Sequence, residues 1–151
     1  MAAEVTFTSS SVIWGKGHVN SGADYAILNS ELGSVVDGSW IPTNNSFVLE
    51  NIGEENVTLN LRSDINAPNF IGGTNPSFKW KAIDSVSSCV NISNAEFTEV
   101  NTTENGVRIC DVFYNDNSTD EIKIYFRLVI PSDATKIGAQ SATITAIARA
   151  I

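Results

Sequence analysis

The side chains in this chain that could carry out catalysis are few and scattered. His18 is the only histidine, and no serine or cysteine stands in a nucleophile motif such as Gly-x-Ser-x-Gly. A histidine without a partner in the sequence is usually structural. No spacing among the 17 acidic residues favours one pair as general acid and base. The sequence therefore predicts a protein that is not an enzyme.

One polar run, residues 115–121, carries clustered oxygen atoms of the kind that bind calcium. Its candidate ligands are Asp116, Asp120 and Glu121. The run lacks the glycine and the distal bidentate glutamate of an EF-hand loop. Asp and Asn also favour solvated turns, because their side chains form local hydrogen bonds. Calcium is the only cofactor that the sequence suggests, and a solvated hairpin turn is the alternative.

Three tryptophans suggest either a binding platform or core packing. Trp14, Trp40 and Trp80 are of the type that stacks against sugar rings in carbohydrate-binding modules. Large aromatic side chains also supply much of the packing energy of a β-sandwich core. Both interpretations are compatible with the sequence.

Two cysteines, Cys89 and Cys110, enclose 20 residues and match no metal-binding spacing. An even count in a chain of this composition predicts a structural disulfide, and two buried free thiols are the alternative. A bridge across such a loop stabilises a fold by roughly 3 kcal/mol in the chain-entropy model. The disulfide also implies an oxidising compartment, which favours a secreted, extracellular protein.

Five Asn-x-Ser/Thr sequons occur, a small excess over chance in a chain with 16 asparagines. Asn44, Asn101 and Asn117 lie in turn-like polar segments, where a glycan would project without disturbing a strand. Those three are the predicted acceptors. Asn56 and Asn91 are the other two asparagines in sequons.

The composition is that of one soluble globular domain covering residues 1–151. Only 17% of residues are charged, and the net charge of -8 argues against nucleic acid and anionic membranes as partners. No stretch is long enough to span a bilayer, so no membrane insertion is expected. The first ten residues lack a basic region and an apolar run, which predicts a mature form without its signal peptide.

Alternating apolar residues dominate the chain and predict an all-β fold. Residues 46–63 read as a half-buried β-hairpin, and the same period of two recurs over residues 121–130. Weak helical turns are conceivable at residues 23–31 and 131–136. The expected strands cover residues 5–8, 12–19, 25–28, 47–51, 57–62, 78–83, 97–100, 107–113, 121–130 and 142–149.

Ten short strands with frequent turns predict a single antiparallel β-sandwich with jelly-roll-like connections. The side chains expected to face the core are Phe47, Leu49, Val57, Leu59, Leu61, Ile122, Ile124, Phe126 and Leu128. The first and the last of these strands lie within longer strand-like segments, residues 3–8 and 140–151. Such strands either complete their own sheet or are donated to a neighbouring subunit.

The segment Phe47-Val48-Leu49-Glu50-Asn51-Ile52-Gly53, followed by alternating residues from Asn56 to Leu61, resembles the hairpin of secreted TasA and camelysin type sandwiches. Archaeal relatives of that group form bundling pili and other extracellular threads. The order of the later segments, from the cysteine loop to the strand at residues 142–146, is also similar to small secreted archaeal surface proteins.

This resemblance implies a jelly-roll sandwich that polymerises with itself by donor-strand exchange through residues 2–8. Val5 and Phe7 would then insert into a groove of the next subunit. The expected function is a non-enzymatic extracellular structural protein, a subunit of a cell-surface filament or pilus. A secreted carbohydrate-binding or calcium-dependent adhesion module is the alternative.

Overall fold

The computed structural model describes residues 3–116 and 120–151. These residues form eleven strands and one short helix. In chain order the elements are β1 (Val5–Ser9), β2 (Tyr25–Asn29), β3 (Ser34–Val36), β4 (Phe47–Asn51), β5 (Val57–Ser63), α1 (Ala67–Phe70), β6 (Ser77–Ile83), β7 (Cys89–Ile92), β8 (Thr98–Glu99), β9 (Val107–Phe113), β10 (Glu121–Pro131) and β11 (Ile144–Ala150).

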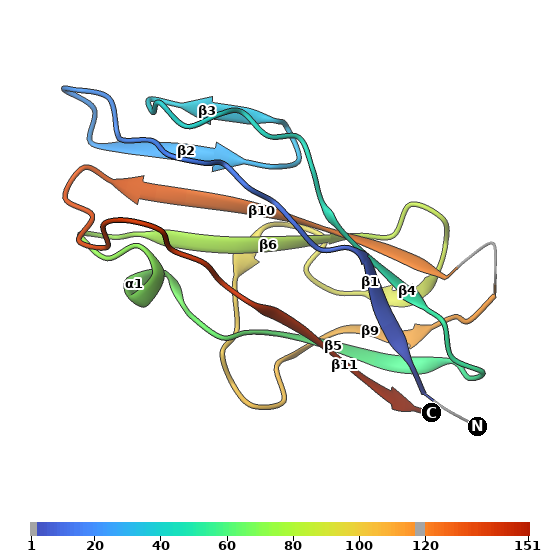
Figure 1. The fold of residues 1–151 in the computed structure, drawn as a ribbon. Coiled ribbons are helices and arrows are strands. Elements are labelled where there is room, and N and C mark those ends of the chain that lie inside the picture. Colours follow the sequence, from blue (N-terminus) through green and yellow to red (C-terminus); the bar gives the residue numbers. More distant parts are fainter. Residues whose placement is uncertain (1–2, 117–119) are drawn as a thin grey trace.

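Two antiparallel sheets pack face to face, which confirms the predicted all-β sandwich (Figure 1). The seven-stranded sheet has the order β1-β4-β10-β2-β3, with β6 on the other side of β10 and β8 beyond β6. The four-stranded sheet has the order β11-β5-β9-β7. The long strand β10 organises the larger sheet, because β6 follows it on one side while β4 and β2 share the other.

The core lies between the sheets and is built from the alternating residues that the sequence indicates. Leu49 on β4, Leu59 on β5 and Ile124 on β10 are fully buried. Of the nine side chains expected to face inward, eight are buried and Phe47 is half-buried. The Phe47 ring meets the ring of Phe126 edge to face at 4.9 Å, so it still closes one side of the core.

The predicted hairpin over residues 46–63 is wrong in its pairing. β4 and β5 are both strands, but β4 pairs with β1 and β10, and β5 pairs with β11 and β9. The turn between them therefore carries the chain from one sheet to the other. Alternation indicates which side chains of a strand face the core, but it does not indicate which strand is the partner. Two strands that lie in facing sheets show the same alternation as two neighbouring strands of one sheet.

Three other expectations about elements differ from the structure. Residues 12–19 contain only an isolated bridge from Val19 to Gly38, and strands β3 and β7 were not expected. No helix forms at residues 23–31, where β2 lies, or at residues 131–136. In the second segment Pro131 ends β10 and a single turn follows, in which the Ala134 N–H donates to the Pro131 carbonyl at 3.0 Å. The one helix instead begins after Asn66, whose side-chain oxygen accepts a hydrogen bond from the Asn69 N–H.

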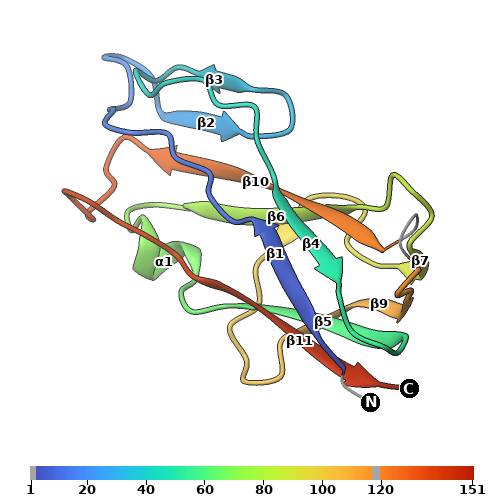
Figure 2. The ribbon, with the colours of Figure 1, turned by 45° about the vertical axis from the view of Figure 1, so that its right-hand side comes forward.

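The strands near both ends of the described chain lie together at one side of the sandwich. β1 is an edge of the seven-stranded sheet and β11 is an edge of the four-stranded sheet, and the two strands are in contact. Figures 1 and 2 show that β1 begins and β11 ends at the same end of the molecule. Across residues 3–116 and 120–151, no helix has the length and apolar character needed to cross a membrane.

Candidate functional site

β1 is an edge strand of the seven-stranded sheet and the first strand of the chain. It pairs with β4 alone, with Thr6 opposite Glu50 and Phe7 opposite Leu49. The register shifts between Phe7 and Ser9, so the ladder is already irregular at its end. Val5 and Phe7, expected in a groove of the next subunit, pack here against the core of their own chain.

The attachment of β1 is modest in energy. Val5 and Phe7 are only half-buried, and the Phe7 ring meets the Phe47 ring edge to face at 5.5 Å. Full burial of a valine or phenylalanine side chain stabilises a fold by about 1.5–3 kcal/mol, so half-burial of the two gives roughly 1.5–3 kcal/mol in total. The larger buried core does not include either residue. The buried core between the sheets is thus formed by residues outside β1, and Val5 and Phe7 pack against it.

A long connection without helix or strand joins β1 to β2. Residues 10–24 run along the outside of the sandwich and are held by a few hydrogen bonds. The Asn45 side chain donates to the Ser11 carbonyl at 2.6 Å, and the Thr43 hydroxyl donates to the Ile13 carbonyl at 3.1 Å. Most residues of the connection are exposed, including its glycines at 15, 17 and 22. Val12, Trp14 and Val19 of this connection nevertheless pack against the core and anchor it there.

An apolar groove of about 1370 Å³ lies beneath this connection. One wall is the 10–23 segment and the other is the 132–144 segment, and the floor is formed by β10, β6 and α1. Aromatic and aliphatic side chains dominate its lining. They include Trp14, Trp40, Phe70, Phe78, Phe126, Leu128, Ile130 and Ile137.

The three tryptophans do not form one platform. Trp80 on β6 is 1% exposed and belongs to the core, which corrects that part of the expectation. Trp14 and Trp40 are half-buried and line the apolar groove. The Trp40 ring lies against Gly17, where an added Cβ would come within 2.3 Å of the ring. The absence of a side chain at Gly17 is thus what allows the indole to lie flat on the backbone.

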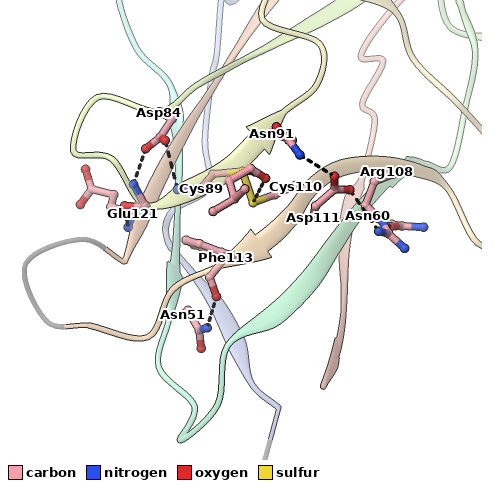
Figure 3. The surroundings of a disulfide bond; sticks show 12 residues. Asn51, Asn60, Asp84, Cys89, Asn91, Arg108, Cys110, Asp111, Phe113 and Glu121 are labelled. Atoms are coloured by element: carbon pink, nitrogen blue, oxygen red, sulfur yellow. Dashed lines mark hydrogen bonds and ion pairs between the residues drawn. A yellow bond between two sulfur atoms is a disulfide. The ribbon is translucent and has the colours of Figure 1, made fainter. Parts of the chain in front are cut away.

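Cys89 and Cys110 form a disulfide, as predicted (Figure 3). The bridge joins β7 to β9 within the four-stranded sheet, with the two Cα atoms 5.9 Å apart. The Asp84 carboxylate fixes the turn before β7, because it accepts hydrogen bonds from the backbone N–H groups of Ser88 and Cys89 at 2.6 and 3.0 Å. The bridge and this turn together hold the edge strand β7.

Asn51 is a structural residue that reasoning from the sequence missed. Its buried side-chain amide donates to the carbonyls of Glu55 and Phe113, both at 3.0 Å, and its side-chain oxygen accepts from the Gly53 N–H at 3.0 Å. Figure 3 shows the link from Asn51 to Phe113 on β9. One side chain thus fixes the turn after β4 and ties the two sheets together. The Leu-x-Asn-x-Gly spacing was the available signal for this role.

The three calcium candidates do not gather into a ligand set. The Asp120 carbonyl accepts a hydrogen bond from the Asn51 N–H, and the Glu121 N–H donates to the Ser88 hydroxyl at 2.8 Å. Asp116 lies on the other side of residues 117–119, which fall outside the described part of the chain. Within the described residues, no group of three or more His, Cys, Asp or Glu is placed to hold a metal ion.

Two of the three predicted glycan acceptors lie in loops of the described chain. Asn44 is exposed, and its side-chain nitrogen donates to the Glu31 carbonyl at 2.9 Å. Asn101 is half-buried, and its side-chain oxygen accepts from the Thr103 N–H at 2.9 Å. Asn117 lies outside the described residues.

Two titratable residues, His18 and Asp133, make local contacts with backbone or side-chain groups. His18 is exposed, and its Nδ1 lies 3.0 Å from the carbonyl oxygen of Val19. Asp133 is the residue whose pKa is clearly displaced. Hydrogen bonds from the Thr74 hydroxyl at 2.7 Å and the Thr74 N–H at 2.9 Å hold its pKa below the usual carboxyl value. Asp133 is exposed, and this contact fastens the loop after β10 to the loop before β6.

Comparison of the chain with protein-family models, with curated proteins and with solved structures found no match.

Proposed function

We propose that this protein is a secreted, non-enzymatic structural subunit that assembles into an extracellular filament on the cell surface by exchange of β1. In this assembly β1 of one copy replaces β1 of the next copy along β4. The observation that carries the proposal is the way β1 is attached. It is an edge strand that pairs with β4 alone, and residues 10–24, which connect it to β2, form no helix or strand. The resemblance of the Leu49 to Gly53 motif to TasA and camelysin type sandwiches supports the same function.

The exchange conserves the contacts of the single chain. A donated β1 would place Val5 and Phe7 against the core of the next copy, where the Phe47 ring is half-buried. The same hydrogen bonds form in the monomer and in the exchanged polymer. The equilibrium between monomer and polymer therefore depends on strain in the connection and on protein concentration, as in domain swapping. Donation from head to tail gives an open filament when the rotation between successive copies does not close a ring.

The disulfide supports placement outside the cell. Disulfides persist in oxidising compartments and are rare in the cytosol. The Cys89–Cys110 bridge joins two neighbouring strands of the smaller sheet, so it has a structural role in the fold. We infer a secreted protein of the cell surface from this bridge and from the polar, asparagine-rich composition.

The test compares two charge substitutions in β1 by light scattering and electron microscopy. Phe7→Asp places a carboxylate against the apolar core and should abolish polymers while leaving a folded monomer. Thr8→Asp adds the same charge at an exposed position of the same strand and should polymerise normally. Removal of residues 1–8 should also leave a folded, less stable monomer. A full-length protein that stays monomeric at high concentration, or polymers of Phe7→Asp equal to those of Thr8→Asp, would refute the exchange.

A second function, binding of carbohydrate by a secreted adhesion module, is supported by one observation. Trp14 and Trp40 line a groove that is open to solvent, so sugar rings can reach them. Titration with polysaccharides should then change tryptophan emission, and Trp14→Phe should reduce the change. Trp80 is buried and supplies a constant background. An unchanged spectrum would remove this second function.

A further inference from the structure

The outer edge of β11 is a long, regular strand edge that no described strand covers. β11 pairs with β5 over all seven of its residues without a register shift. The Asp64 N–H donates to the Thr143 carbonyl at 3.0 Å, so the odd-numbered residues of this strand make the bonds to β5. The backbone N–H and C=O groups of the even-numbered residues therefore point outward. These are Ile144, Ala146, Ala148 and Ala150.

The other strand edges carry features that discourage pairing, and β11 does not. β1 has a register shift, β3 has three residues, β8 has two, and β7 is interrupted by Asn91 at a φ of 57°. β11 contains no proline and only one charged residue, Arg149. The Arg149 guanidinium donates to the Asn105 side chain at 3.1 Å, which draws the charge across β5 and away from the edge.

We propose that β11 pairs with β11 of a second copy of this chain, antiparallel, about a two-fold axis at Ile147. In this register Ala146 lies opposite Ala148 of the second copy, and Ile144 lies opposite Ala150 of the second copy. The two four-stranded sheets then form one continuous sheet of eight strands. The occupant of the edge is thus a second copy, because the edge is complementary to itself.

Three features of the strand select this register. All seven residues of each strand overlap, and every outward N–H and C=O group of the four even-numbered residues meets a partner. Ile147 meets its own counterpart in a pair without backbone hydrogen bonds, where side chains come closest. Arg149 lies opposite Thr145 of the second copy, so the two guanidinium groups do not face each other.

The pairing does not depend on exchange of β1. β1 contacts β11 but belongs to the other sheet and forms no ladder with it, and the β11 ladder to β5 is complete in the single chain. A filament formed by exchange would gain lateral contacts through β11, whereas a protein that does not exchange would form pairs.

Two single-cysteine variants of the full chain test the register directly. Ile147→Cys places two thiols at the two-fold axis, where paired Cα atoms lie about 4.5 Å apart, within reach of a disulfide. Thr145→Cys, on the same face of the same strand, places the two Cα atoms about 14 Å apart, beyond the reach of a disulfide. Mild oxidation should convert most of Ile147→Cys, and little of Thr145→Cys, to a covalent dimer on a denaturing gel without reductant. No dimer of Ile147→Cys, or equal dimer in both variants, overturns the proposal.

A second measurement covers association without cross-linking. Ile147→Lys places two ammonium groups together at the axis and should lower the average mass in sedimentation equilibrium toward that of the monomer. Val90→Lys makes the same change at an exposed valine on β7, the opposite edge of the same sheet, and should leave the mass unchanged. Equal masses for the two variants overturn the proposal. In the two single-cysteine variants each chain carries one added thiol. Their cross-link therefore gives covalent dimers and never the ladder of larger oligomers expected from exchange of β1.

Discussion

Asn51 should contribute a large share of the stability, because one buried amide joins the two sheets. Asn51→Ala removes two donated hydrogen bonds and one accepted bond and leaves the carbonyls of Glu55 and Phe113 without these partners. At about 1 kcal/mol for each bond, with a further cost for buried groups left unpaired, the expected loss is about 3–5 kcal/mol of the free energy of unfolding. Urea unfolding followed by tryptophan fluorescence measures this loss.

Asn51→Asp gives a sharper form of the same prediction. The introduced carboxylate keeps the shape and the bond from Gly53, but it faces two carbonyl oxygens in a buried site. Burial and these oxygens raise its pKa above the unfolded value of about 3.9. The variant therefore keeps most of its stability below about pH 3.9 and loses it as the pH rises, by at most about 1.4 kcal/mol per pH unit.

The matched control is Asn56→Asp, which adds the same charge at an exposed position of the same turn. Its side-chain oxygen accepts a hydrogen bond from the Asn115 N–H, and aspartate keeps that bond. The control should differ from the natural protein by no more than about 0.5 kcal/mol. If the two aspartate variants have equal stability at pH 7, or if the loss in Asn51→Asp does not grow with pH, the proposed link between the sheets is wrong.

Three further changes test the account of the fold. Replacement of Cys89 and Cys110 by alanine should lower the free energy of unfolding by about 3 kcal/mol, measured by urea unfolding. Asp133→Asn should lower the melting temperature near neutral pH, because the folded pKa of Asp133 is depressed by Thr74, and the difference should vanish as the pH falls through that pKa. Gly106→Ala should destabilise the fold by about 1–3 kcal/mol, because Gly106 has a φ of 65° and an added Cβ would lie 2.2 Å from a backbone oxygen of β5. A melting curve equal to that of the natural protein would contradict this expectation.

Reasoning from the sequence located most strands and their buried faces because a period of two is a local signal. β4 and β9 have the bounds expected from the sequence, and the inward side chains of β5 and β10 are those that the alternation indicates. The partner of each strand is not local information. Alternation therefore predicts a hairpin at the turn after Asn51, although this turn carries the chain from one sheet to the other.

The elements that were missed have weak or conflicting local signals. β3 is three residues long and follows Gly33, and β7 is interrupted by a left-handed residue at Asn91. Residues 12–19 alternate like a strand, but the segment contains Gly15 and Gly17 and forms only the isolated bridge from Val19 to Gly38. Of the candidate sites, the disulfide followed from spacing and count, whereas the apolar groove depends on segments more than a hundred residues apart.

Exchange of β1 is tested most directly by a disulfide between Thr6→Cys and Glu50→Cys. These residues are register partners, and the Ile52 N–H to Glu4 carbonyl bond makes theirs a hydrogen-bonded pair with Cα atoms about 5.5 Å apart, suitable for a disulfide. In polymers oxidised after assembly, exchange joins β1 of each copy to β4 of the next. The account predicts a ladder of covalent oligomers on a denaturing gel without reductant, and at most dimers for Glu50→Cys alone. Polymers of the double variant that yield only internally cross-linked monomer would contradict it.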